Sequence, residues 1–160
     1  MKTFLELLEQ ANSEIKQISC AELNQELGND NLVIVDVRSK EIIQSDGVIE
    51  GSINIPRGML EFHADQREEN PFRRTELDPN KKIVLYCGAG GQSALSSKTL
   101  QDMGFNNIFN LTGGTNAWVE ACFSLRNNLF RFCLSKKYQL IFSRQFSKIG
   151  GKKSKLALQA

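Results

Sequence analysis

Cys87-Gly88-Ala89-Gly90-Gly91-Gln92-Ser93 is the stretch around which the predicted fold is organised. It follows Lys82–Tyr86, an apolar run whose length and β-branched content predict a buried strand. It precedes residues 94–104, where helix-forming residues lead to a glycine at the position of a helix end. The sequence therefore predicts a cysteine at the end of a strand, on a glycine-rich turn that opens a helix.

Such a turn has a chemical consequence for the cysteine. It directs several backbone N–H groups into one small bowl, and the helix dipole adds partial positive charge there. This environment stabilises a thiolate and can lower the pKa of a cysteine from about 8.5 to roughly 3.5–7.5. A cysteine at a strand end is otherwise a small core residue. Glycine at 88, 90 and 91 favours a reactive cysteine, because a structural turn seldom needs all three.

Two nucleotide-binding motifs were compared with the same stretch. A Walker A loop ends in Gly-Lys-Ser/Thr, whereas Gln92 stands here in place of the lysine that contacts phosphate. A dinucleotide fingerprint needs a third glycine where Ser93 stands, and an acidic residue about 20 positions later. Asparagines and apolar residues occupy that later region. Both interpretations lack the residues that perform the chemistry.

Charge divides the chain into an acidic body and a basic tail. All 18 acidic residues but only 11 of the 20 basic ones precede Ala121, which gives residues 1–120 a formal charge of −7 and leaves nine basic residues after them. We predict an amphipathic helix over 1–15, one domain over 16–121 and a tail over 122–160. The tail has two interpretations: a segment that contacts an acidic surface or nucleic acid, or a frameshifted or read-through ending without a role.

The cysteine pattern and the N-terminus indicate a compartment. The four cysteines form no C-x-x-C pair and the chain has one histidine, so neither a metal site nor a disulfide framework is expected. Glu6 and Glu9 interrupt the apolar N-terminal stretch, which argues against a signal peptide. These features predict a cytoplasmic protein without a membrane span.

Predicted strands and helices alternate along the body. Beyond 82–86, strands are expected at 17–19, 32–38, 52–55 and 107–111, with helices at 4–15, 21–27, 39–44, 57–63 and 115–121. The run Leu32–Val35 is apolar without a break, as in strands buried on both faces of a parallel sheet. The predicted class is therefore α/β with a mainly parallel sheet, in which function gathers at the carboxyl ends of strands.

Five separated segments, in this order, resemble the rhodanese-like sulfurtransferase domain. They are Val35-Asp36-Val37-Arg38, the run Gly47 to Pro56, the run Arg57 to Phe62, the run Cys87 to Ser93, and the run Leu111 to Trp118. The resemblance implies a five-stranded, mainly parallel sheet with helices on both faces. It also implies that Cys87 takes a sulfane sulfur from thiosulfate or a persulfide and passes it to a thiophilic acceptor, without a cofactor.

The resemblance also suggests roles for other residues. Residues 88–93 (Gly88, Ala89, Gly90, Gly91, Gln92 and Ser93) are expected to form the substrate-binding loop, with Arg57 as a cation near the pocket. Asp36 and Arg38 are expected to support the pocket structurally, Arg38 by pairing with an acid such as Glu41. Gln92 departs from the family pattern, because arginine is common at that position.

Two other functions fit parts of the same pattern. A phosphatase of the same fold needs Cys-x5-Arg to bind phosphate, and Ser93 occupies the arginine position. A sulfur-relay or binding module that receives sulfur from a protein persulfide, without turning over small donors, remains open because Gln92 is neutral.

Overall fold

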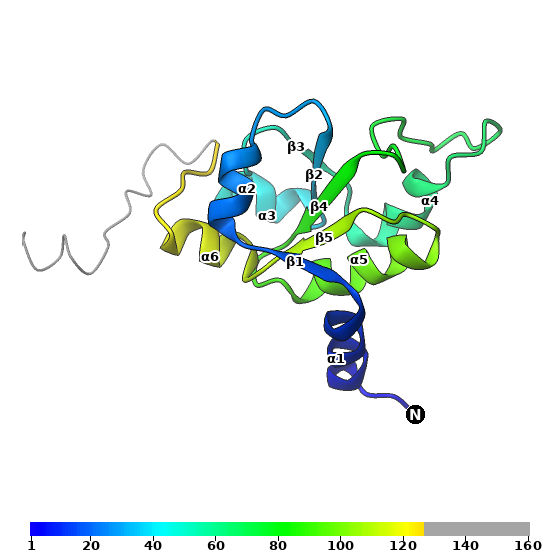
Figure 1. Ribbon diagram of the computed structural model, residues 1–160, viewed down its shortest axis with the longest axis horizontal. Helices are drawn as coiled ribbons and strands as arrows, with labels where there is room; N and C mark the ends of the chain where they lie inside the picture. The colour runs from blue at the N-terminus through cyan, green and yellow to red at the C-terminus, as the bar shows by residue number, and fades with distance from the viewer. Residues whose placement is uncertain (127–160) are drawn as a thin grey trace, which may run out of the picture.

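The computed structural model describes residues 1–126 as one sheet with helices on both faces (Figure 1). The strands are β1 (Lys16–Ile18), β2 (Leu32–Asp36), β3 (Ser52–Asn54), β4 (Lys82–Tyr86) and β5 (Ile108–Leu111). The helices are α1 (Phe4–Glu14), α2 (Cys20–Glu26), α3 (Lys40–Asp46), α4 (Leu60–Ala64), α5 (Gly91–Asp102) and α6 (Gly114–Glu120), with a 3₁₀ turn at Arg57–Met59. The strand order is β1-β5-β4-β2-β3, and every pairing between these strands is parallel. The predicted α/β class and five-stranded sheet are confirmed.

Side chains that alternate along the central strands belong to two separate hydrophobic cores, one on each face of the sheet. In β4, Ile83 and Leu85 belong to one buried cluster, while Val84 and Tyr86 belong to the other. The first cluster is closed by Leu60 of α4 and Leu100 of α5 and also contains Cys87. The second is closed by Leu23 of α2 and Trp118 of α6. Because side chains alternate along a strand, Cys87 faces the α4 and α5 side of the sheet.

The sheet brings the loops after several strands to one edge. Asp36 at the end of β2 lies opposite Tyr86 at the end of β4, and Val37 N–H donates to the Tyr86 carbonyl. Cys87 follows directly, so it occupies the carboxyl edge of the sheet beside the β2 loop. This is the edge at which parallel α/β sheets place their functional loops.

One boundary differs from the sequence prediction in a way that matters for the loop. Helix α5 begins at Gly91 rather than near Ala94, so Gly91, Gln92 and Ser93 form its first turn. Gly90 precedes them in the left-handed conformation, with φ of 92°. The first N–H groups of a helix have no partner within it. Those of α5 therefore lie within the glycine-rich stretch itself.

Packed structure continues to Arg126, beyond the predicted domain end at 121. Leu125 is buried in the second cluster, and Trp118 Nε1 donates to the Ser124 carbonyl at 3.2 Å. Arg126 and Val48 exchange backbone hydrogen bonds. Most of the tail predicted over 122–160 lies outside the described residues, so its role stays a prediction. No helix in residues 1–126 is long and apolar enough to cross a membrane.

Among residues 1–126, Cys20 and Cys87 are free thiols, and both are buried.

Candidate functional site

The Cys87 sulfur lies inside the loop that it begins. Its Sγ accepts a hydrogen bond from the Gly90 N–H at 3.2 Å, and the Ser93 hydroxyl lies 3.5 Å from it. The Ser93 hydroxyl is also 3.1 Å from the Gly90 carbonyl, so its one proton is shared between two acceptors. Cys87 is 4% exposed and Ser93 is fully buried. The sulfur therefore sits among donors, at the N-terminus of α5.

The start of α6 holds this loop from the other side. Thr115 N–H donates to the Cys87 carbonyl at 2.8 Å, and Asn116 N–H donates to the Gly88 carbonyl at 3.0 Å. The approach is so close that a Cβ on Gly114 would lie 2.2 Å from the Cys87 carbonyl oxygen. These anchoring residues were not among the predicted site residues. The Gly113-Gly114 pair was the available signal, because consecutive glycines indicate a close backbone approach.

Arg57 reaches the loop, as the sequence suggested, but not its sulfur. Its Nη1 donates to the Ser96 hydroxyl at 3.0 Å and lies 3.5 Å from the Gln92 carbonyl. Arg57 is half-buried, whereas Gln92 is exposed on the first turn of α5. The guanidinium thus contacts the outer side of that turn. Within residues 87–93, only the side chains of Ala89 and Gln92 are exposed.

Asp36 and Arg38 form a buried ion pair at the same edge of the sheet. Arg38 Nη2 contacts Asp36 Oδ2 at 2.7 Å and donates to the Gly47 carbonyl at 2.7 Å. Both residues are at least 97% buried, and the guanidinium lies over the Tyr86 ring, which belongs to the second core. The pair therefore lies on the opposite face of the sheet from Cys87.

The predicted partner of Arg38 was wrong. Arg38 pairs with Asp36 and, at 3.7 Å, with Asp46, rather than with Glu41, which is exposed on α3. Asp36 is the last residue of β2, so its carboxylate is fixed in place two residues before the buried guanidinium. Burial alone lowers the pKa of Arg38, but the hydrogen bonds and charge of Asp36 raise it above its usual value.

Tyr86 links the end of β4 to the segment that leads into β3. Its hydroxyl accepts the Ile49 N–H at 3.1 Å and lies 2.9 Å from the Ser52 hydroxyl. Burial, followed by the nearby charge of Asp36, raises the pKa of Tyr86 well above its usual value. The phenol is therefore a neutral structural link between β4 and the segment before β3.

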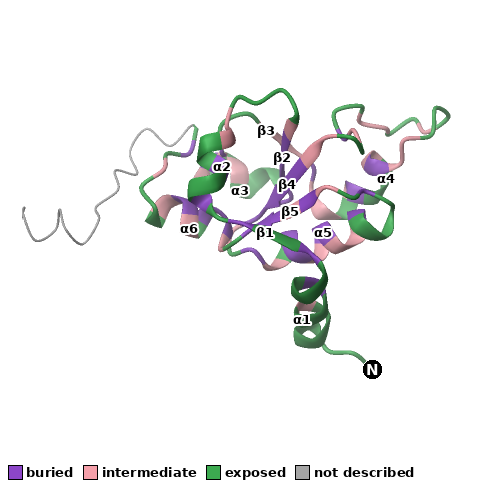
Figure 2. Ribbon diagram, viewed as in Figure 1, coloured by how far each residue is buried: buried purple, intermediate pink, exposed green. Residues whose placement is uncertain are grey.

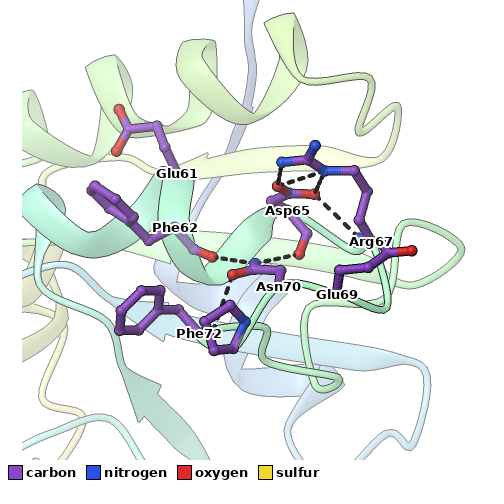
Figure 3. Close-up of a pocket in the computed structure, with 8 residues that line it drawn as sticks. Glu61, Phe62, Asp65, Arg67, Glu69, Asn70 and Phe72 are labelled. Carbon is purple, nitrogen blue, oxygen red and sulfur yellow. Dashed lines mark hydrogen bonds and ion pairs between the residues drawn. The ribbon is translucent and has the colours of Figure 1, made fainter.

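A hollow near α4 is separate from this loop (Figure 3). Its walls include Phe62 and Phe72, whose rings meet edge to face with centroids 6.0 Å apart. Asn70, which also lines the hollow, donates hydrogen bonds to the Phe62 and Asp65 carbonyls, and the Asp65 side chain is paired with Arg67. No residue of the Cys87 loop lines this hollow.

Comparison with known proteins identifies the class. Residues 19–121 match the rhodanese-like domain family, so the chain belongs to that family. It is 26% identical over 107 residues to a sulfurtransferase of Allochromatium vinosum, covering 66% of this chain and 90% of that protein. It is 28% identical over 109 residues to the thiosulfate sulfurtransferase GlpE of Shewanella oneidensis, covering 68% of this chain and 97% of that protein.

A solved structure from Rhodopseudomonas palustris superposes with a TM-score of 0.73 and 36% identity, covering 79% of this chain and 96% of that chain. That protein is described as having unknown function and as a possible tyrosine phosphatase. The likeness extends over more of this chain than the family match, which begins at residue 19.

The buried Asp36–Arg38 pair has an exposed counterpart that allows a controlled test. Asp65 and Arg67 have the same spacing and the same side-chain pairing, but Arg67 is largely exposed. We expect Asp36→Asn to lower the free energy of unfolding by about 3 kcal/mol, because the buried guanidinium keeps only the longer contact to the partly exposed Asp46 carboxylate. Asp65→Asn should change it little. Urea unfolding of both variants measures this difference, and a loss in Asp36→Asn as small as that expected for Asp65→Asn would show that the Asp36–Arg38 pair does not support the fold.

Proposed function

We propose that this chain is a sulfurtransferase in which Cys87 carries the transferred sulfur as a persulfide. The observation that carries the proposal is the Gly90 N–H directed at Cys87 Sγ, beside the first turn of α5. Hydrogen bonds to an anion are stronger than those to a neutral group. The same donors suit the thiolate before sulfur transfer and the persulfide anion after it.

The two half-reactions balance without a cofactor. The Cys87 thiolate attacks the outer sulfur of thiosulfate, a bond forms from Sγ to that sulfur, and the sulfur–sulfur bond of the donor breaks. Sulfite leaves with the electron pair. This leaves Cys87 as a persulfide anion, which takes the proton of the acceptor thiol. The acceptor thiolate then attacks the outer sulfur of the protonated persulfide. The acceptor leaves as a persulfide, which keeps the proton, and the Cys87 thiolate is restored.

The site argues against a phosphatase. Phosphoryl transfer on this type of loop needs a bidentate guanidinium at position 93, and Ser93 is instead buried against Cys87 Sγ. Arg57 contacts the first turn of α5 from outside, through the Ser96 hydroxyl and the Gln92 carbonyl. Neither residue places a positive charge inside the loop.

A second candidate is a relay module that accepts sulfur from a protein persulfide and turns over small donors poorly. Gln92 favours it, because the exposed position on the rim of the loop carries a neutral amide. Thiosulfate is a dianion, and two like charges about 4 Å apart at an effective dielectric near 20 repel by about 4 kcal/mol. Because position 92 carries no cation, only the backbone N–H groups of the loop offset that repulsion.

The role of Cys87 is tested by mass spectrometry of the protein after incubation with thiosulfate or a small persulfide. We expect wild type to gain the mass of one sulfur atom, on the peptide that contains Cys87. Cys87→Ser should gain none, because an alcohol cannot form a persulfide. Cys20→Ser is the matched control, since Cys20 is the other buried free thiol and burial raises its pKa. Retention of the adduct in Cys87→Ser, or its loss in Cys20→Ser alone, contradicts the proposal.

The effect of Gln92 on the choice of sulfur donor is tested by placing a cation at this position. Gln92→Arg should lower the KM for thiosulfate, and the gain should shrink as salt rises because the guanidinium is exposed to screening. Gln101→Arg is the control, since it adds the same charge to an exposed position at the far end of α5. Steady-state kinetics at low and high salt measure both. If the two variants behave alike, Gln92 does not set donor choice.

A further inference from the structure

The hollow near α4 is lined by α4 and by the segment that follows it (Figure 3). That segment, residues 65–81, forms neither helix nor strand before β4 begins. Connections of this length without secondary structure are uncommon in compact domains, and those that are ordered usually carry a function. Figure 2 shows that most of the segment is exposed or half-buried at the periphery of the molecule. It is therefore a candidate contact surface.

Hydrogen bonds tie this segment to α4. Asn70 Nδ2 donates to the Phe62 carbonyl at 2.7 Å, and Asn70 Oδ1 accepts the Phe72 N–H at 3.0 Å. The Phe72 carbonyl lies 2.6 Å from His63 Nδ1. Leu77 is fully buried in the first core and anchors the end of the segment. The segment is thus ordered, and Phe72 is held beside Phe62.

Two aromatic side chains are exposed together in the hollow. Phe62 is 54% exposed and Phe72 is 50% exposed. Their rings meet edge to face at 81°, and Pro71 also lines the hollow. A single exposed aromatic side chain needs no explanation, but exposed apolar groups that gather in one place mark a contact site. The pair therefore offers an apolar surface that the described residues leave uncovered.

Carboxylates surround this aromatic pair. Glu61, Asp65 and Glu69 line the hollow, and Arg67 is the one basic residue among those that line it. Arg67 is paired with Asp65. Glu61 and Glu69 are exposed and have no ion-pair partner among residues 1–126. The rim of the hollow therefore carries a net negative charge.

A lysine or arginine side chain matches both features of the hollow. Its aliphatic stem packs on the rings while its charged end stays in water at the rim. A cation is attracted both to the face of an aromatic ring and to unpaired carboxylates. An acidic segment would be repelled, and an uncharged apolar segment would gain nothing from the carboxylates. The hollow therefore favours positive charge next to apolar surface.

The shape of the hollow indicates the size of what binds. Phe62 and Phe72 both remain about half exposed, so the hollow is shallow. Small-molecule sites bury most of the surface of their ligand, which a shallow hollow cannot do. A protein segment covers both rings and contacts the carboxylates at the same time. It is therefore a better match than a free amine.

We propose that the hollow near α4 is a docking surface for a basic segment of a partner protein. This segment carries lysine or arginine beside an apolar side chain. The apolar side chain covers Phe62 and Phe72, and the cations pair with Glu61 and Glu69. Because α4 covers the face of the sheet to which Cys87 belongs, the partner docks on that face. Docking does not depend on sulfur transfer by Cys87.

Binding is measured by NMR titration of the full chain with N-acetyl-lysyl-leucyl-lysinamide, the lysine peptide. We expect the backbone signals of residues 61–72 to shift, and the affinity to fall as salt rises, because the carboxylates are exposed to screening. The same peptide with glutamate in place of lysine should leave these signals unchanged. Equal shifts with both peptides, or no shift with the lysine peptide, would overturn the proposal.

Charge variants with a matched control locate the contact. Glu61→Gln combined with Glu69→Gln should weaken binding of the lysine peptide about fivefold, as the loss of two exposed ion pairs predicts. Glu9→Gln combined with Glu41→Gln is the control, because it removes the same charge from exposed positions that do not line the hollow. Equal weakening by both double variants would show attraction to the acidic body as a whole and overturn the proposal.

The aromatic rings are tested in the same titration. Phe72→Ala should weaken binding of the lysine peptide several-fold, and Phe72→Leu should weaken it less because an apolar surface remains. Phe4→Ala is the control, since Phe4 is 60% exposed on α1 and does not line the hollow. Circular dichroism checks that each variant is folded. Wild-type binding by a folded Phe72→Ala variant would contradict the proposal.

Cross-linking with a water-soluble carbodiimide identifies the occupant. The reagent forms an amide between a carboxylate and an amine in contact with it, and takes up the water that is lost. With the lysine peptide, we expect mass spectrometry to find the peptide attached at Glu61 or Glu69. In the protein alone, a link from either residue to a lysine of the same chain or of a second copy would assign the hollow to this chain itself and overturn the proposal.

Discussion

The contact between the start of α6 and the Cys87 loop determines the geometry of the site. Two N–H groups of α6 donate to the carbonyls of Cys87 and Gly88. In the loop held in this way, the Gly90 N–H donates to Sγ. Only glycine permits this approach at position 114, because a Cβ there would lie within 2.2 Å of a carbonyl oxygen. The anion-binding role proposed for the loop depends on this contact.

The sheet separates Cys87 from the buried side chains that hold the neighbouring loops in place. Cys87 belongs to the core covered by α4 and α5, whereas Tyr86, the residue before it, faces the other core. Asp36, Arg38 and Tyr86 bind the loops after β2 and before β3 from that second side. Buried charge is thus kept away from the sulfur, where a carboxylate would oppose a thiolate.

Local patterns in the sequence predicted the elements and the loop well. Apolar runs with β-branched residues correctly predicted β2 and β4, and a Ser19–Glu22 capping box begins α2. The register of β4 places Cys87 at the strand end, as its position after Tyr86 predicted. Arg57 contacts Ser96 of α5 from the 3₁₀ turn that follows shortly after β3, and its role near the sulfur stays a prediction.

Contacts between distant segments were not predictable in the same way. The partner of Arg38 depends on which carboxylate is buried with it, and periodicity does not distinguish Asp36 from Glu41. A second hollow, beside α1, joins residues about 100 positions apart, such as Leu8 and Asn110, so no local pattern indicates it. The start of α5 at Gly91 was missed because glycine is a poor helix former, while the left-handed Gly90 makes this start possible.

The most direct test of the central claim is the rate of sulfur loading on Cys87 in Gly114→Ala, compared with Gly51→Ala. Both glycines have positive φ, 58° and 77°, but only Gly114 lies against the loop, since a Cβ on Gly51 meets nothing within 4 Å. If the α6 contact shapes the sulfur site, Gly114→Ala should load sulfur at least about tenfold more slowly while circular dichroism shows a folded protein. Gly51→Ala should load at close to the wild-type rate. Wild-type loading by a folded Gly114→Ala variant would contradict the account.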